Sequence, residues 1–155
     1  MDRAKKEGRY QRLYTQIEGL MHKPGNKLSK MATIAAVLHH KLEYFFWTGF
    51  YLLDNDKLQV GPYQGPVACQ ELEKNKGVCW AGINGGKTVV VEDVHQFPGH
   101  IACDSRSKSE IVVPLKTPDG NIIGVLDVDS GELASFDDVD AQYLEKIVSL
   151  IFLPT

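Results

Sequence analysis

A cysteine in a short polar loop is the best candidate for reactive chemistry in this chain. Cys103 lies just before the apolar run of residues 111–115 and outside any hydrophobic segment. Residues of both charge types flank it: His100, Arg106 and Lys108 are basic, and Asp104 and Glu110 are acidic. The first group would lower the thiol pKa and the second would raise it, so the sequence leaves the sign open. A bystander thiol in a capped loop is the alternative interpretation.

Three acids are placed to handle a proton near such a thiol. Asp127 and Asp129 are two residues apart in an expected strand, so their side chains share one face, where repulsion and burial would raise one pKa. Glu110 begins the neighbouring expected strand, from which it would hold an ammonium group or share the proton. The alternative is that all three are exposed acids at strand ends.

Two aromatic residues are spaced to form one wall of a pocket. Trp47 and Tyr51 are four residues apart in a β-favouring segment, which puts both on the same face. Such a wall would pack against an apolar ligand group and offer cation–π contact to an ammonium. Ordinary core packing is the alternative for both residues.

The histidines do not predict a metal centre. His95, His100 and Cys103 are the nearest candidates in sequence, but they are not part of a close Cys/His quartet with the spacing of a structural zinc site. We therefore expect no metal, and we expect His95 and His100 to order the loop.

Composition narrows the protein class. The 155 residues are 43% hydrophobic and 24% charged, which is typical of one globular domain, and the formal net charge of −3 does not favour binding to nucleic acid or to an anionic membrane. The charged N-terminus does not resemble a signal peptide, and no apolar run reaches membrane-spanning length. Three cysteines without a Cys-x-x-Cys pair argue against a secreted disulfide framework. These features predict a cytoplasmic protein.

The remaining pattern predicts helices at both ends of an antiparallel sheet. Helical spacing covers residues 9–21 and 28–42, with Asn26 or Ser29 as cap, and a last helix opens at residues 135–138. Strands are expected at residues 44–53, 58–62, 67–72, 88–92, 110–115 and 122–129, and a short helix at 77–84. The expected fold is therefore α+β, with five or six mainly antiparallel strands and the terminal helices packed on the sheet.

Several segments together resemble the free methionine-(R)-sulfoxide reductases, a family of GAF domains. They are residues 47–53 (WTGFYLL), 61–65 (GPYQG), 91–95 (VEDVH), 99–104 (GHIACD), 109–115 (SEIVVPL) and 124–130 (GVLDVDS), together with the three cysteines. The resemblance runs from about Tyr14 to Leu150 and implies a single GAF-like domain over residues 1–155. It also implies reduction of free methionine-(R)-sulfoxide without a bound cofactor.

The resemblance assigns roles to the candidate residues. It implies that Cys103 attacks the sulfoxide sulfur while the oxygen is protonated, and that Cys69 resolves the resulting sulfenic acid into a disulfide. An external reductant such as thioredoxin, supplied ultimately by NADPH, would then reduce that disulfide. Cys79 is either an alternative partner or a structural thiol. The substrate-side residues implied are Glu110, Asp127, Asp129 and Trp47, with Tyr51 left ambiguous.

Three classes of function stay open at this point. An enzyme is favoured over a small-molecule sensor, because a sensor normally transmits to an attached output domain. A redox switch without turnover would use the same reversible disulfide between Cys69 and Cys103, and only catalytic turnover distinguishes it. A homodimer is compatible with the sequence, which does not fix the oligomeric state.

Overall fold

The computed structural model describes residues 1–100 and 103–154. Its main elements follow the chain in this order: α1 (Arg3–Met21), α2 (Lys27–Lys41), β1 (Trp47–Asp54), β2 (Lys57–Gln64), β3 (Glu71–Leu72), α3 (Gly77–Gly85), β4 (Val89–Val91), β5 (Ser109–Lys116), β6 (Ile122–Ser130) and α4 (Asp138–Ser149). Short 3₁₀ turns follow β4 (Val94–Gln96) and α4 (Leu150–Phe152). None of these helices combines the length and apolar character needed to cross a lipid bilayer.

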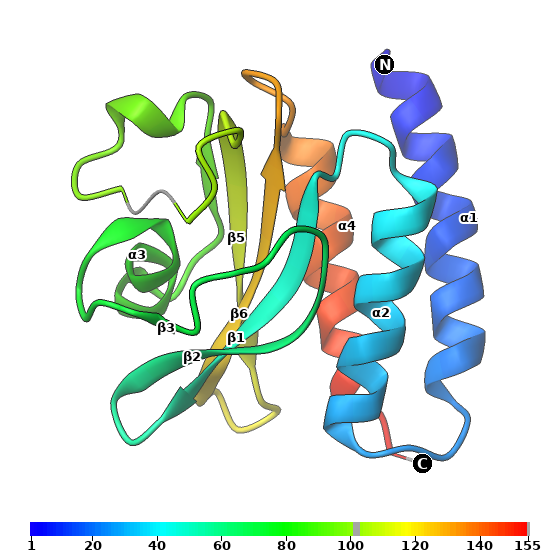
Figure 1. Cartoon of the computed structure of the whole chain (residues 1–155). Coiled ribbons are helices and arrows are strands. Elements are labelled where there is room, and N and C mark those ends of the chain that lie inside the picture. Colours follow the sequence, from blue (N-terminus) through cyan, green and yellow to red (C-terminus); the bar gives the residue numbers. More distant parts are fainter. Residues whose placement is uncertain (101–102, 155) are drawn as a thin grey trace.

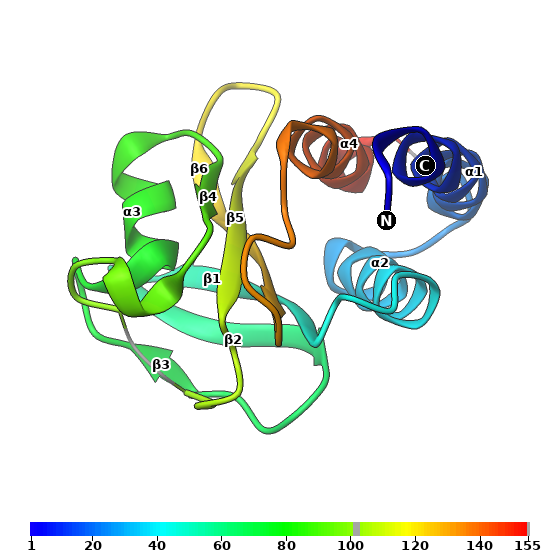
Figure 2. The same cartoon turned by 90° about the horizontal axis from the view of Figure 1, so that it is seen from above.

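One antiparallel sheet divides the molecule into two sides. Its strand order is β3-β2-β1-β6-β5-β4, and every neighbouring pair is antiparallel. Helices α1, α2 and α4 cover one face, while α3 and the connecting loops cover the other (Figures 1 and 2). The predicted α+β class, the antiparallel sheet and the terminal helices packed on it are confirmed.

Alternation along the central strands gives each face its own core. Phe50, Leu126 and Val128 point toward the three long helices, whereas Tyr51 and Val125 point toward α3. Successive strand residues face opposite sides, so one strand supplies both cores. Asp127, between Leu126 and Val128, must therefore face α3, where a carboxylate interrupts an otherwise apolar surface.

Side-chain caps explain where the first two helices begin. The Asp2 carboxylate accepts a hydrogen bond from the Lys5 backbone N–H at 2.9 Å, so α1 begins at Arg3 and not at the expected residue 9. Of the two cap candidates for α2, Asn26 serves, since its side-chain oxygen accepts from the Ser29 N–H at 2.8 Å. The apolar periodicity predicted too late a start, because the first turns of α1 consist mainly of charged residues outside the apolar stripe.

The last helix begins at the end of the segment 135–138 in which its start was expected. Asp137 accepts from the N–H groups of Val139 and Asp140, and the Asp140 carboxylate accepts from the Asp137 N–H at 2.8 Å, completing a capping box. The helix therefore begins at Asp138, and the preceding Ser135 bonds to the loop that follows β6.

The strand expected at residues 67–72 is mostly wrong, because only Glu71–Leu72 pairs with β2. Backbone carbonyl groups just before Glu71 accept hydrogen bonds from aromatic side chains instead. The Trp47 indole N–H donates to the Pro66 carbonyl at 3.0 Å, and the Tyr51 hydroxyl donates to the Cys69 carbonyl at 3.0 Å. A chain held by side chains in this way does not form a backbone ladder. The loop is thereby fixed against the aromatic wall.

A buried ionic network joins the first and last helices. The Asp140 carboxylate is fully buried and accepts from the Lys6 ammonium at 2.7 Å, the Tyr10 hydroxyl at 2.7 Å and the Tyr44 hydroxyl at 2.6 Å. These contacts tie α1 and the chain before β1 to the start of α4. Because every partner is buried or half-buried, the network depends on the carboxylate at its centre.

We expect Asp140→Ala to lower the free energy of unfolding by about 3–5 kcal/mol, because it leaves the Lys6 ammonium buried with weaker partners. The matched control is Asp138→Asn, which removes the pair with Arg3 at 2.7 Å between side chains that are 58% and 59% exposed. That change should cost about 1 kcal/mol or less. Urea denaturation measures both, and equal losses for the two variants would contradict the assigned importance of the buried network.

Candidate active site

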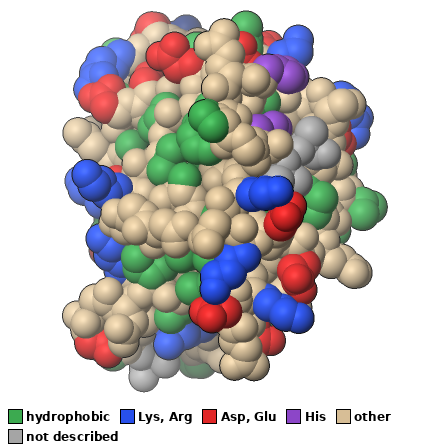
Figure 3. Space-filling view, turned by 90° about the vertical axis from the view of Figure 1, so that its left-hand side faces the viewer, with side chains coloured by type: hydrophobic (Ala, Val, Ile, Leu, Met, Phe, Trp, Pro, Cys, Tyr) green, Lys and Arg blue, Asp and Glu red, His purple; other side chains and the backbone are tan. Residues whose placement is uncertain are grey.

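A pocket opens on the α3 face of the sheet, between that helix and the loops before and after it. The pocket contains about 600 Å³ of empty space, a volume that includes solvent at its open mouth. Its lining includes aromatic residues (Trp47, Tyr51), cysteines (Cys79, Cys103), acids (Asp104, Glu110, Asp127, Asp129) and His100, together with aliphatic side chains. Figure 3 views this side of the molecule, where apolar side chains and charges of both signs share the surface.

Strand register brings the predicted acids together. Asp129 on β6 is paired with Trp47 on β1 and with Glu110 on β5, so these three form one row across the sheet. One step down β6 on the same face, Asp127 is paired with Gly49 and Val112. These two adjacent rows of paired residues therefore place Asp127, Asp129 and Glu110 on one wall of the pocket.

Burial makes these acids unusual. Glu110 and Asp127 are 6% and 5% exposed, so they are not exposed strand-end acids, and Asp129 is half-buried. Burial, reinforced by the neighbouring aspartates, holds the pKa of Glu110 well above its ordinary value. Burial also raises the pKa of Asp127, and burial together with the Asp127 charge raises that of Asp129. Adjacent carboxyl groups of this kind retain protons that isolated surface acids lose.

The predicted aromatic wall is formed by stacked rings. Trp47 lies 5.8 Å from Tyr51 and 5.2 Å from Tyr63, measured between ring centroids, with interplanar angles of 25° and 20°. Gly49 permits this stack, because a Cβ there would lie 2.7 Å from the Trp47 ring and would also collide with Tyr63. The sequence did not single out Tyr63, whose place behind Trp47 follows from the pairing of β1 with β2.

A disulfide joins Cys69 and Cys103 at the pocket, with their Cα atoms 5.5 Å apart. The two residues are separated by 34 positions in the chain, and Cys103 lies in the polar loop before β5. This is the pair for which the family resemblance implied a thiol–disulfide cycle. Cys103 is exposed and Cys69 half-buried, so an external molecule can reach this bond.

Two of the charged residues near Cys103, Asp104 and Arg106, pair with each other. The Arg106 guanidinium donates to both Asp104 oxygens at 3.0 and 2.7 Å, lies over the Phe46 ring at 4.9 Å, and lowers the pKa of Asp104 to about 2. The Arg106 side chain is thus held by the Asp104 carboxylate and by the Phe46 ring. The pair fixes the loop more than it tunes the thiol. The adjoining residues 101 and 102 lie outside the described residues.

Comparison with known proteins identifies the family. Residues 33–152 match the GAF domain family. The chain is 48% identical to GAF domain-containing protein A of Dictyostelium discoideum, covering 97% of this chain and 95% of that protein. It is 41% identical to the free methionine-R-sulfoxide reductase of Escherichia coli, covering 90% and 84% respectively. The chain belongs to the free methionine-R-sulfoxide reductase family of GAF domains. The expected family, an oxidoreductase family, is thereby confirmed.

A solved reductase structure supports the same family. The free methionine-R-sulfoxide reductase of Neisseria meningitidis, determined in complex with its substrate, superposes with a TM-score of 0.90 at 44% identity, covering 97% of this chain and 89% of that one. Within this reductase fold, every residue for which the sequence predicted a catalytic or substrate-binding role lies at or beside the pocket.

The third cysteine of this reductase-family chain is a free thiol on the pocket floor. Cys79 is only 4% exposed and is carried by the first turn of α3. Burial raises the thiol pKa, and the nearby Asp127 and Glu110 add to the effect. Cys79 is therefore a poor nucleophile in this state, which favours the structural interpretation over the alternative partner.

The two loop histidines have different surroundings. His95 Nδ1 lies 3.0 Å from Asp93, and that side chain is 65% exposed. His100 lines the pocket, with Nε2 at 3.9 Å from Glu110 Oε1, and burial lowers its pKa. His100 thus belongs to the pocket wall, while His95 lies in the turn after β4 that the Asp93 carboxylate caps.

Sequence reasoning missed the N-terminus of α3 as part of the reductase-type pocket. Lys76, Gly77 and Val78 line it, and within the described residues Lys76 makes no side-chain cap hydrogen bond to the first N–H groups of the helix. Gly77 has φ +81°, a conformation that favours glycine. The sequence signal that could have indicated this helix start beside the pocket is the pair Lys76-Gly77.

Proposed function

We propose that this chain reduces free L-methionine-(R)-sulfoxide to methionine. The observation that carries the proposal is the disulfide between Cys69 and Cys103 at a pocket whose wall holds three carboxyl groups of raised pKa. A thiol and a proton donor facing one cavity are what sulfoxide reduction needs. The substrate named for the Neisseria relative supports the same choice.

The proposed cycle accounts for each atom. The Cys103 thiolate attacks the sulfoxide sulfur, a protonated carboxyl among Glu110, Asp127 and Asp129 supplies a proton to the oxygen, and methionine leaves as Cys103 keeps that oxygen as a sulfenic acid. The Cys69 thiol then displaces the oxygen as water and forms the disulfide. Two electrons have passed from the cysteines to the substrate. This structure corresponds to that oxidised end of the cycle.

Regeneration requires an external dithiol. We propose a thioredoxin-type reductant, itself reduced at the expense of NADPH, whose thiolate attacks the disulfide from solvent. Val67, two residues before Cys69, is 85% exposed and offers an apolar contact beside the bond. The need for such a reductant is consistent with a cytoplasmic location. A homodimer stays a prediction.

We also propose that residues 1–155 act as one domain. The family match begins at residue 33. Helix α1, which precedes it, nonetheless buries Tyr10, Leu13 and Ile17 in the main core beside α2 and α4. A chain without α1 would expose this apolar surface.

The pocket is suited to a free amino acid. Its acids favour an ammonium group, Trp47 and Tyr51 suit the methyl-sulfinyl end, and the N-terminus of α3 suits a carboxylate. Incorporation into a peptide removes both charges and adds chain where walls stand.

We therefore expect the free R epimer to be reduced with a kcat/KM on the order of 10⁴-fold above peptide-bound methionine sulfoxide, because unpaired pocket groups penalise the peptide. The measurement is methionine formation from separated epimers, free and within a short peptide, with thioredoxin, thioredoxin reductase and NADPH. Equal rates on free and peptide-bound sulfoxide would reject an enclosed amino-acid pocket. Oxidation of the two cysteines without repeated turnover would favour the redox-switch function.

A further inference from the structure

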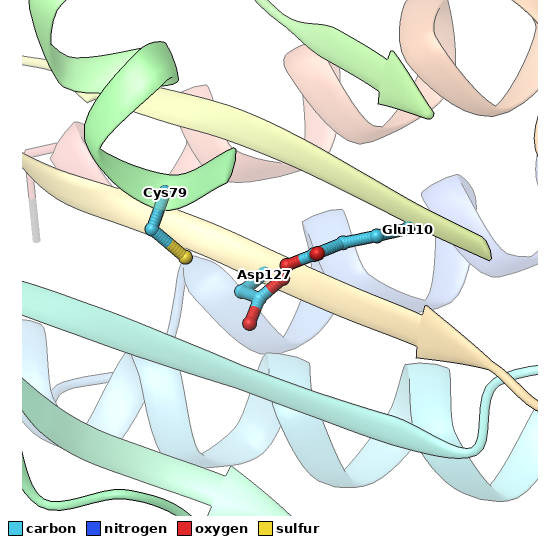
Figure 4. Close-up of side chains that lie close together, drawn as sticks. All are labelled: Cys79, Glu110 and Asp127. Atoms are coloured by element: carbon cyan, nitrogen blue, oxygen red, sulfur yellow. The ribbon is translucent and has the colours of Figure 1, made fainter. Parts of the chain in front are cut away.

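Three ligand-type atoms meet on the pocket floor. The Cys79 sulfur, a Glu110 carboxyl oxygen and an Asp127 carboxyl oxygen all lie within 4.8 Å of one another. Figure 4 shows the Asp127 carboxyl between the sulfur and the Glu110 carboxyl. The three side chains come from α3, β5 and β6 and are each at most 6% exposed. They are therefore held by packed elements and not by surface loops.

An unpaired atom in the cluster points to a ligand. Asp127 is 95% buried, and its Oδ1 has no hydrogen-bond partner in residues 1–100 and 103–154. A buried carboxylate oxygen without a partner is costly, and native proteins normally satisfy it. A cation bound between the sulfur and the two carboxyl groups would satisfy it directly.

We propose that Cys79, Glu110 and Asp127 form a binding site for one thiophilic divalent cation of the Zn²⁺ class. A thiolate with two carboxylates suits Zn²⁺, Co²⁺ or Cd²⁺, whereas Mg²⁺ and Ca²⁺ prefer oxygen ligands alone. Binding releases to solvent the thiol proton and any proton that the two carboxyl groups share, so Cys79 coordinates as a thiolate and Glu110 and Asp127 as carboxylates. The open pocket leaves the remaining coordination position to water.

The site does not use the residues that a metal search of the sequence considered. His95, His100 and Cys103 do not belong to this cluster, and Cys103 is bonded to Cys69. The proposal therefore departs from the expectation, drawn from those residues, that the chain holds no metal, and it assigns the cation no part in sulfoxide reduction. The effect of the cation on activity, which rests on the proposed function, is inhibitory, because the cation occupies carboxyl groups assigned to the substrate.

Binding is tested on the disulfide form of the protein, which has one free thiol. Titration with Co²⁺ should show one ion per chain, with thiolate-to-cobalt charge-transfer absorption that Zn²⁺ abolishes. Cys79→Ser should remove that absorption and weaken binding by more than about 100-fold, since changes even outside the ligand set cost about 10–100-fold. Glu110→Gln, which keeps side-chain size, should weaken binding without removing the absorption. Circular dichroism confirms that each variant is folded.

Two control variants should keep the ion. Glu92→Gln changes an exposed acid outside the pocket. The double variant Cys69→Ser/Cys103→Ser removes the other two thiols. Loss of the ion in the double variant, unchanged affinity in Cys79→Ser, or absence of the charge-transfer absorption would each overturn the site.

Inhibition is measured separately on reduced protein freed of reductant, by the methionine formed in one turnover with and without Zn²⁺. We expect Zn²⁺ to raise the half-saturating concentration of substrate at least about 10-fold in the parent and equally in Glu92→Gln, which keeps the site, and we expect a chelator to reverse the rise in both. Tight binding without this rise would overturn the competition. Absence of turnover in metal-free protein would reject the proposed function and leave the binding result as it stands.

Discussion

Cys103→Ser is expected to lower turnover of free methionine-(R)-sulfoxide at least about 1,000-fold, because a serine hydroxyl is not ionised near neutral pH and cannot attack the sulfoxide sulfur. Cys103 is exposed, so the substitution should leave the fold intact. Methionine formation measures the effect, and thermal unfolding confirms that the variant is folded. Near-normal turnover by a folded variant would contradict the role assigned to this cysteine.

Cys69→Ser is the matched comparison for that variant. One equivalent of methionine per chain should still form, because attack by Cys103 does not need the second thiol, but recycling through thioredoxin should fail. Cys79→Ser should recycle normally, since the disulfide forms without Cys79. If the Cys79 variant shows the single-turnover behaviour and the Cys69 variant does not, the two roles are exchanged.

Asp127→Asn and Asp129→Asn form the second large expected effect. The variant that removes the proton donor should lose about 10²–10⁴-fold in kcat with a smaller change in KM, because the lost proton matters chiefly as the S–O bond breaks. Glu110→Gln should show a larger rise in KM if Glu110 mainly holds the ammonium. The matched control is Glu92→Gln, an exposed acid outside the pocket, which should keep both constants. Unchanged kcat in both aspartate variants would leave the proposed cycle without its donor.

The pH profile gives a second measurement on the same variants. Burial raises the pKa of Glu110, Asp127 and Asp129, so the shared proton is kept at low pH and lost as pH rises through the raised values. Activity should therefore fall on the alkaline side. The Asp127 charge contributes to the raised pKa of Glu110 and Asp129, so Asp127→Asn should move that fall to lower pH. An unchanged pH profile in Asp127→Asn would show that these carboxyl groups do not cause the alkaline loss of activity.

Local pattern predicted the acids and aromatics well because strand geometry is periodic. Residues two or four apart on a strand share a face, so Asp127 with Asp129 and Trp47 with Tyr51 followed from sequence alone. Their closeness to Glu110 depended on pairing between strands. The sequence indicated it only by placing Glu110 at the start of the neighbouring strand, and the register of β5 with β6 gives it.

Other features depended on contacts that the sequence pattern does not encode. The chain before Cys69 resembles a strand in composition, but hydrogen bonds from Trp47 and Tyr51 hold it as a loop. The early start of α1 depends on a cap at Asp2 and on Lys6, whose partner Asp140 is 134 residues away. The closeness of Cys79 to Asp127 required α3 to pack on the sheet, which no short-range spacing indicates.

The sheet between the two hydrophobic cores separates stability from catalysis in this molecule. Leu13, Ile34 and Leu144 pack on the helical side, while the pocket residues lie on the opposite side of the same strands. Substitutions at sites that share no contacts usually have additive effects. The helical layer can therefore diverge or be engineered for thermal robustness while the chemistry across the sheet is kept, and selection can act on each side independently.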